Sequence, residues 1–459
     1  MTTRVNFDET LEAKDIEFHF HGYTNAKKHL EVGPLIIESG EGIYVFDNDG
    51  KRYIEGMAGL WSVGVGFNEP RLIDAITRQA QKLPFYHNFG HKSHGPAIEL
   101  AEQLIGLAPV PMSKVFYTNS GSEANDTALK MIWYRSNALG KPDKKKIIAR
   151  QRGYHGVTIA AASLTGLPNN HRSFDLPIDR VLHTSAPHYW KNARPDETEE
   201  EFATRCANEL DALIQTEGPD TIAAFFAEPV MGAGGVVTPP RTYFAKIQAV
   251  LAKYDILFVA DEVICGFGRT GSMFGSQTYD IRPDIMVMSK QITSSYVPFS
   301  ALMVNARVFD PIAEESDRIG TFGHGFTAGG HPLGAAVALE NIAIIRERHL
   351  VENARDVGAY FIGRLQELKS SRLVGEVRGV GLIAAIELVE DQAKKSVGTP
   401  GRLGGLMNAA LQRNGLISRT MTDTAAFCPP LIITRAQIDE MLDLIVKSLR
   451  ELEDAVPAA

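Results

Sequence analysis

The sequence predicts an α/β protein with a mostly parallel central sheet flanked by helices. Short apolar runs at residues 222–227, 256–260 and 285–288 each end in polar residues, as buried parallel strands do. A segment with a helical apolar pattern, residues 242–254, lies between two of these runs. At 459 residues the chain is too long for one small core, so a second domain is expected.

The remaining elements follow from local patterns. Residues 43–55 alternate around Asn48-Asp49-Gly50, which predicts a hairpin. Residues 114–118 form an apolar run that leads through a Gly/Ser turn into a helical pattern at residues 123–137. Further helices are predicted at residues 70–83, 96–107, 197–215 and 333–346, and further strands at residues 146–150 and 301–305.

From about residue 335 the elements become shorter and mixed. Helices are predicted at residues 351–368, 403–413 and 435–452, with Thr434 as N-cap of the last, and a strand at 381–388. We therefore divide the chain into three parts. Residues 76–334 form a large domain, residues 335–459 a small α+β domain, and residues 1–75 a segment that joins the small domain.

Composition argues against several classes of protein. A formal net charge of −8 without a long basic block disfavours nucleic acid as a partner. No apolar run reaches the ~20 residues of a membrane helix, and the charged N-terminal stretch has no apolar core for a secretion signal. The three cysteines are too widely spaced for a disulfide framework or a metal site, so we expect no metal and a cytoplasmic location.

Two charged residues follow the central strands. Asp261 and Lys290 come at the carboxyl ends of the runs at 256–260 and 285–288, where open α/β sheets bind ligands. Pyridoxal phosphate (PLP) needs both groups, because its aldehyde bonds covalently to a lysine amine and its ring nitrogen needs an anionic partner. Either residue alone is better explained as a surface lysine or a helix-capping aspartate.

The motif around these two residues favours the cofactor. Asp261-Glu-Val263 is followed by Gly-Phe-Gly-Arg-Thr-Gly at residues 266–271 and then by the strand-ending Lys290. In this the chain resembles class III (omega) aminotransferases of PLP fold type I, from about residue 35 to its C-terminal end. The resemblance implies PLP as cofactor, with Lys290 and Asp261 as catalytic residues. Many members have glycine on both sides of the lysine, whereas Ser289 and Gln291 stand here.

The resemblance also implies further cofactor contacts. The turn before residue 123 is a potential anion site, because the first backbone N–H groups of a helix lack partners; an ordinary capped helix is at least as good an explanation. In the family this segment binds the phosphate, which assigns Gly121 and Ser122. In the family, the threonine that matches Thr327 binds the phosphate of the PLP in the neighbouring subunit, which implies a homodimer. Around the ring we expect Tyr154 stacked on its face, with His155, Glu228 and Val263 beside it.

Substrate contacts are implied less directly. By composition alone Trp61 is a core residue, but matching positions in amine-acting members line the substrate pocket. Ala233 stands where members acting on ω-amino acids such as ornithine often carry glutamate. Arg419 could grip a carboxylate in bidentate fashion, and an exposed structural arginine is close to equally good an explanation. The predicted substrate site consists of Leu60, Trp61, Phe89, Tyr154, Ala233 and Arg419.

The pattern resembles the amine–pyruvate transaminase subgroup. It implies ping-pong transfer of an amino group from a primary amine or ω-amino acid to a keto acid, with pyruvate expected. The alternatives are a taurine or β-alanine–pyruvate transaminase, a class III PLP racemase or aminomutase, and a PLP-binding scaffold without activity.

Overall fold

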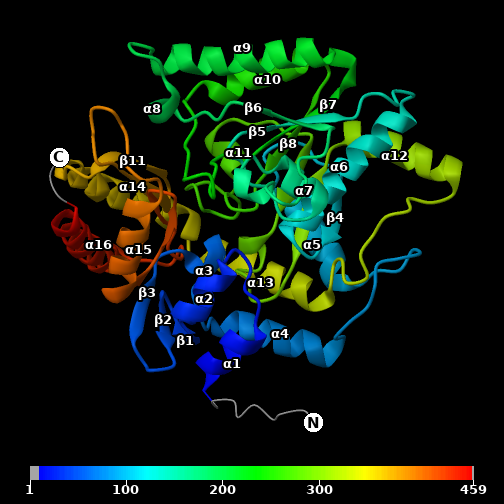
Figure 1. Ribbon diagram of the computed structural model, residues 1–459. Coiled ribbons are helices and arrows are strands. Elements are labelled where there is room, and N and C mark those ends of the chain that lie inside the picture. The colour runs from blue at the N-terminus through cyan, green and yellow to red at the C-terminus, as the bar shows by residue number, and fades with distance from the viewer. Residues whose placement is uncertain (1–9, 457–459) are drawn as a thin grey trace, which may run out of the picture.

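The computed structural model describes residues 10–456, whose centre is a seven-stranded sheet (Figure 1). The strands lie in the order β4-β10-β9-β8-β7-β5-β6. β10 is antiparallel to both neighbours, and the other described pairs are parallel, which confirms the predicted sheet. The strands are β4 Lys114–Thr118, β5 Lys146–Arg150, β6 Val181–Thr184, β7 Ile222–Ala227, β8 Leu257–Asp261, β9 Ile285–Met288 and β10 Ser300–Val304.

Helices cover both faces of this sheet. Apolar side chains of α9 (Glu199–Glu217) and α10 (Tyr243–Lys253) pack on one face, and those of α6 (Gly121–Ala138) and α12 (Ala306–Ile319) pack on the other. Figure 1 shows α9 and α10 along one side of the sheet, away from α6 and α12. β7 to β10 are buried at every position, which explains their continuous apolar runs.

The two ends of the chain meet in a smaller sheet. β13 (Leu416–Ile417) is parallel to β3 (Arg52–Glu55), which forms a hairpin with β2 (Tyr44–Asp47) as predicted. In Figure 1 the blue N-terminal strands lie beside α15 (Arg402–Arg413) and α16 (Arg435–Ala455). β1 (Ile37–Glu41) extends this sheet, and a third sheet contains β11 Val374–Val380, β12 Ile383–Leu388, β15 Thr424–Phe427 and β14 Arg419–Met421.

The remaining helices lie outside the three sheets' strands, and α1, α2 and α8 contain no buried residue. No helix among residues 10–456 has both the length and the apolarity needed to cross a bilayer. These helices are α1 Leu11–Phe18, α2 Ala26–Val32, α3 Ala58–Trp61, α4 Pro70–Lys82, α5 Gly95–Leu107, α7 Ile159–Leu164, α8 Tyr189–Asn192, α11 Gly275–Thr278, α13 Pro332–Glu347 and α14 Leu350–Gln366.

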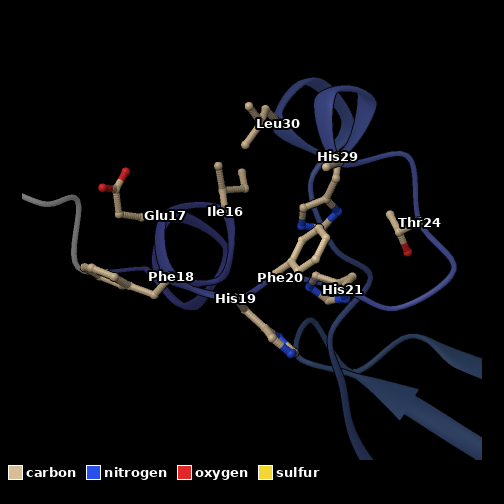
Figure 2. Close-up of a pocket in the computed structure, with 10 residues that line it drawn as sticks. Ile16, Glu17, Phe18, His19, Phe20, His21, Thr24, His29 and Leu30 are labelled. Carbon is tan, nitrogen blue, oxygen red and sulfur yellow. The ribbon is translucent and has the colours of Figure 1, made fainter. Parts of the chain in front are cut away.

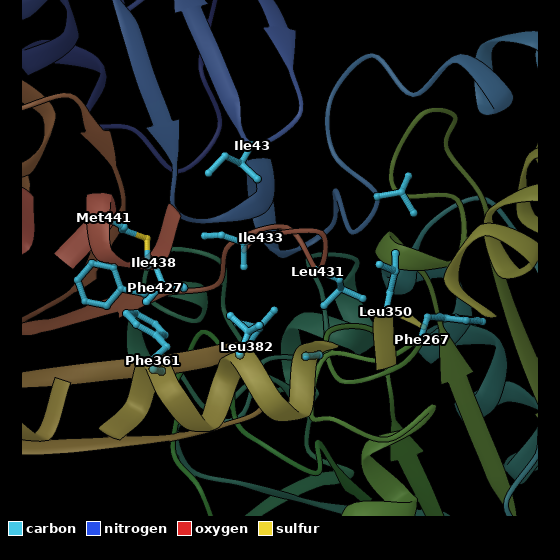
Figure 3. Packing of buried hydrophobic residues seen from close by; sticks show 14 of the residues in the cluster. Ile43, Phe267, Leu350, Phe361, Leu382, Phe427, Leu431, Ile433, Ile438 and Met441 are labelled. Atoms are coloured by element: carbon cyan, nitrogen blue, oxygen red, sulfur yellow. The ribbon is translucent and has the colours of Figure 1, made fainter. Parts of the chain in front are cut away.

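The Gly-Phe-Gly-Arg-Thr-Gly segment joins the parts of the structure. Phe267 packs in one apolar cluster with side chains from α14, α16 and the loop that contains Leu431 (Figure 3). Arg269 is fully buried, and its guanidinium donates to the carbonyl oxygens of Leu382 (2.9 Å) and Pro429 (2.6 Å). Phe267 and Arg269 of this motif therefore have packing roles, which join the central sheet to the C-terminal part of the chain.

Most predicted elements are present, with ends shifted by a few residues. The sequence analysis missed the strands β1, β6, β11, β13, β14 and β15 and the helices α1, α2, α3, α7, α8, α11 and α12. β1 contains mostly polar, exposed residues, and Pro311 lies inside α12, so neither shows a clear pattern. We keep the division at residues 75/76 and 334/335 as a proposal; α4 and α13 cross these two points. Residues 1–9 and 457–459 of the proposed outer parts lie outside the described residues.

Two glycines of α14 provide a matched test of the packing. A Cβ at Gly358 would come within 2.1 Å of the Gly381 carbonyl oxygen, whereas a Cβ at Gly363 would meet nothing within 4 Å. We expect Gly358→Ala to lower the free energy of unfolding by about 1–3 kcal/mol, because backbone must move. Gly363→Ala should raise it by about 0.5–1 kcal/mol through helix propensity. Urea unfolding midpoints measure both, and equal midpoints would contradict the close contact.

Candidate active site

A cavity of about 120 Å³ lies at the carboxyl ends of β7, β8 and β9. Eight of the nine residues predicted to bind the cofactor line it, and Thr327 is the exception. Gly156, Ile264 and Ser289 complete the lining and were not predicted. The predicted residues in the lining are Gly121, Ser122, Tyr154, His155, Glu228, Asp261, Val263 and Lys290.

Asp261 is the last residue of β8 and is 2% exposed. Its Oδ2 accepts a hydrogen bond from Asn125 Nδ2 (2.9 Å) and lies 2.8 Å from His155 Nδ1, while its Oδ1 accepts from the Val263 N–H (3.1 Å). These partners fix the carboxylate and offset part of its desolvation. The sequence analysis did not assign a role to Asn125. Its position one helical turn after Gly121, on the buried side of α6, is the only sequence feature that could have indicated one.

Lys290 follows β9 in a strained backbone conformation, with φ of +48°. Its loop is fixed through the buried Gln291, which accepts from Arg269 (3.1 Å) and whose carbonyl accepts from Asn341 Nδ2 (2.7 Å). Gln291 thus has a structural role at the position where many family members carry glycine. Burial lowers the pKa of Lys290 to about 8, although Asp261 and Glu228 act in the opposite direction.

Glu228 directly follows β7 and is a buried carboxyl group. Its oxygens accept from the backbone N–H groups of Tyr154 (2.9 Å) and Gly232 (3.0 Å). Burial raises the pKa of Glu228 above its usual value. The residue therefore holds the backbone of Tyr154 and of the loop that leads to Ala233 beside the cavity.

The start of α6 forms the opposite wall. Ser120 caps the helix, and the first N–H groups have no partner within it, which makes the wall suitable for an anion. A Cβ at Gly121 would lie 3.1 Å from Val263 Cγ2, so glycine keeps this wall open. Ser122 Oγ accepts from the Val157 N–H (3.0 Å). An amine, a fixed carboxylate and an anion-binding helix start around one cavity fit PLP.

The predicted substrate residues do not gather at the cavity as the predicted cofactor residues do. Of this set only Tyr154 lines the cavity. Trp61 is 1% exposed in an apolar cluster with Ile264, which does line it, while Leu60 is exposed and Ala233 half-buried. Burial, and then a hydrogen bond with Tyr23, raise the pKa of Tyr154, whereas the nearby charge of Arg419 opposes that shift. The substrate roles of these residues stay predictions.

Phe89 and Thr327 lie outside the cavity that contains Lys290. Phe89 is half exposed and lines a separate groove of about 440 Å³, together with Phe116 and Phe326. Thr327 is exposed in the turn that follows Phe326. The structure therefore does not bring these two residues to the lysine of the same chain.

The fold and the site define a PLP-dependent enzyme of fold type I. Residues 24–449 match the family model described as aminotransferase class-III. The chain belongs to the class III aminotransferase family, and the alternative of a scaffold without catalytic function is set aside.

Relatives at high identity cover nearly the whole chain. A gamma aminobutyrate transaminase 1 of Solanum lycopersicum is 50% identical over 436 residues, covering 95% of this chain and 85% of that protein. A rice gamma-aminobutyrate transaminase 1 is 47% identical, covering 96% and 86%. The solved omega transaminase from Pseudomonas jessenii in complex with PMP, the pyridoxamine form of the cofactor, is 57% identical, with a TM-score of 0.97 and coverage of 97% and 99%.

The lowered pKa of Lys290 predicts how the apoenzyme captures PLP. The neutral amine is the nucleophile, and its fraction rises as pH rises through about 8. Between pH 7 and 9 the rate constant for cofactor binding should rise roughly tenfold and then level off, because almost all of the amine is then neutral. For an ordinary lysine, with a pKa near ~10.4, the rate constant would continue to rise above pH 9. Stopped-flow absorbance measures the rate, with N-acetyl-lysine as model amine. A rate that keeps rising to pH 10, as for the model amine, would contradict the assignment.

Proposed function

We propose that the protein transfers an amino group from a primary amine or an ω-amino acid to a keto acid, with pyruvate as acceptor. The observation that carries this proposal is the buried amine of Lys290 in one cavity with the fixed carboxylate of Asp261. The solved omega transaminases support an amine donor, and the relatives named gamma aminobutyrate transaminases support an ω-amino acid. In the proposed reaction, donors of both classes give one amino group, and the same keto acid receives it.

We assign proton transfer to Lys290 and positioning roles to Asn125, His155 and Glu228. Bound PLP supplies the carbonyl that takes up the amino group and a ring that accepts electrons. Lys290 Nζ, whose pKa is about 8, would hold the cofactor and would accept the proton from the donor carbon in its neutral form. Asp261 would be the anionic partner of the ring nitrogen, and Asn125 and His155 hold Asp261 in place. Glu228 fixes the backbone of Tyr154, whose side chain would stack on the ring.

Arg419 supports the choice of a keto acid as acceptor. It begins β14, is half-buried, and its charge acts on both Tyr154 and Lys290. A guanidinium at this position can bind the carboxylate of pyruvate or of an ω-amino acid. The family resemblance implies that Ala233 lies near the arginine, and alanine has no charge that would compete for the guanidinium.

We also propose a homodimer, in which each chain completes the site of the other. Phe85, Tyr86 and Phe89 are each 40–48% exposed on one loop, an apolar surface suited to a protein partner. This loop borders the groove next to Thr327, and a second copy seated there would bring Phe89 and Thr327 to its own cavity. The relatives' names place those proteins in mitochondria or chloroplasts, and the cytoplasmic location stays a prediction.

The proposed reaction is tested with a donor panel and pyruvate. We expect alanine from 1-phenylethylamine and from γ-aminobutyrate or β-alanine, with taurine and ornithine included as further donors. With donor alone, pyridoxamine phosphate should accumulate, which a racemase or aminomutase would not do. Lys290→Ala should abolish alanine formation and the visible absorbance of lysine-bound cofactor, whereas Lys253→Ala, an exposed surface change, should leave both intact. No alanine from any donor would overturn the proposal.

The carboxylate-binding role of Arg419 is tested by comparing an acceptor that has a carboxylate with one that has none. Arg419→Gln should raise KM for pyruvate roughly 10–100-fold, since a charged hydrogen bond contributes about 1.5–3 kcal/mol. Reaction with benzaldehyde, which has no carboxylate, should keep its KM. Arg413→Gln, which removes an exposed ion pair with Glu451, is the matched control and should change neither value. Equal changes for both acceptors would exclude a carboxylate-binding role.

A further inference from the structure

A cluster of metal-ligating side chains lies in the N-terminal segment, outside the proposed active site (Figure 2). Asp15, on α1, is surrounded by three histidines. Its carboxylate oxygens lie 3.1 Å from His19 Nδ1, 2.9 Å from His21 Nε2 and 2.9 Å from His29 Nε2. The four residues come from α1, from the loop after it and from α2, so the cluster links both helices.

The spacing of the donor atoms is close to that of a coordination site. One ligand atom each of Asp15, His19 and His21 lie within 4.8 Å of one another. In a tetrahedral site with bonds of ~2.0–2.1 Å, ligand atoms are about 3.4 Å apart. The separations of 2.9–3.1 Å between the carboxylate of Asp15 and its imidazole neighbours need to open by only a few tenths of an ångström, and His29, which lies near Asp15 but outside this group of three, must move toward His19 and His21 to become a fourth ligand. An open cavity of about 200 Å³, lined by His19, His21 and His29, provides a path for an ion.

The chemistry of the donors selects the class of ion. Three imidazole nitrogens and one carboxylate oxygen suit Zn²⁺ and similar transition metals, whereas Mg²⁺ and Ca²⁺ prefer oxygen ligands. A neutral imidazole needs only its other tautomer to become a ligand.

A second cluster of histidine and carboxylate side chains differs from the Asp15 cluster because an arginine already binds its carboxylates. His188, Glu376 and Glu387 also lie within 4.8 Å of one another. There Arg378 donates to Glu376 (2.6 Å) and to Glu387 (2.7 Å), so a guanidinium already supplies the positive charge. No lysine or arginine is within ion-pair distance of Asp15 among the described residues, only histidines.

The segment around Asp15 has little apolar core to stabilise it. α1 and α2 contain 8 and 7 residues, and neither includes a buried residue. Phe20 is 84% exposed and Leu30 60%. Helices this short are marginal without packing, and small units of this kind are commonly held by a metal or a disulfide.

The loop between α1 and α2 connects the cluster to the active site. It carries Tyr23, whose ring centroid lies 6.4 Å from that of Tyr154, and whose Oη accepts a hydrogen bond from Asn170 Nδ2 (2.5 Å). Tyr154 lines the cavity with Lys290. An ion that fixes α1 against α2 would therefore also fix Tyr23 beside Tyr154.

We propose that Asp15, His19 and His21, with His29 as the fourth ligand, bind a divalent transition metal ion such as Zn²⁺, and that the ion holds α1, α2 and Tyr23 in place beside Tyr154. The ion is structural and takes no part in amino transfer. The inference does not depend on the proposed reaction, because binding and stability are measured without turnover. A purely hydrogen-bonded Asp–His cluster is the opposing outcome.

The test uses tag-free, full-length holoenzyme in a buffer that does not chelate metals. Calorimetric titration with Zn²⁺ should show one tight site per chain for the wild type, and Mg²⁺ at the same concentration should not compete. His21→Ala and Asp15→Asn should weaken binding at least tenfold. His349→Asn is the matched control, because His349 is exposed, far along the chain and in a left-handed conformation that asparagine tolerates.

A second readout separates binding at this cluster from binding elsewhere. Zn²⁺ should raise the Tm and slow proteolysis between α1 and α2 in the wild type and in His349→Asn, but not in His21→Ala. Circular dichroism and cofactor absorbance verify that each variant is folded. Absence of a stoichiometric site in the wild type, or equal Zn²⁺ binding by His21→Ala, would overturn the metal site and leave the aminotransferase proposal untouched.

Discussion

The structure depends on placing a carboxylate and a primary amine together beside one cavity at the carboxyl ends of the central strands. Burying either group costs several kcal/mol unless its charge is compensated. Asp261 is compensated by the Asn125 side chain, the Val263 N–H and His155. Lys290 is stabilised differently, because its lowered pKa lets the amine lose its proton. One carboxylate held by hydrogen bonds and one amine that can be neutral are the pair that PLP chemistry uses.

Residues far from the cavity maintain this arrangement. Arg269 donates to two carbonyl groups of the C-terminal part and to Gln291, next to Lys290. Asn341, on α13, bonds the backbone of the same loop. Because these contacts link the sheet, α13 and the C-terminal strands, the strained conformation of Lys290 is fixed by the whole fold rather than by its own strand.

The sequence predicts the central sheet well because β7, β8 and β9 are buried on both faces and so are continuously apolar. Of the eight cofactor residues of the cavity, Asp261 and Lys290 follow from their positions at strand ends, and the other six follow from the resemblance to class III aminotransferases. Asn125 and Gln291 could not be predicted, because their roles come from partners more than 20 residues away. The Asp15 cluster was also missed, although Asp15, His19 and His21 have a compact spacing, since His29 joins them only after the chain folds back.

The parallel pairing of β3 with β13 has a consequence for biosynthesis. Ile54 pairs with Leu416, so about 360 residues separate two adjacent strands. At about 5–20 residues per second, a ribosome needs roughly 20–70 s to supply the second strand after the first has emerged. During that interval one edge of the N-terminal hairpin exposes unpaired backbone groups, which other nascent chains could pair with. Holdase chaperones that cover this edge would then determine the yield of folded protein more than the stability of the finished enzyme does.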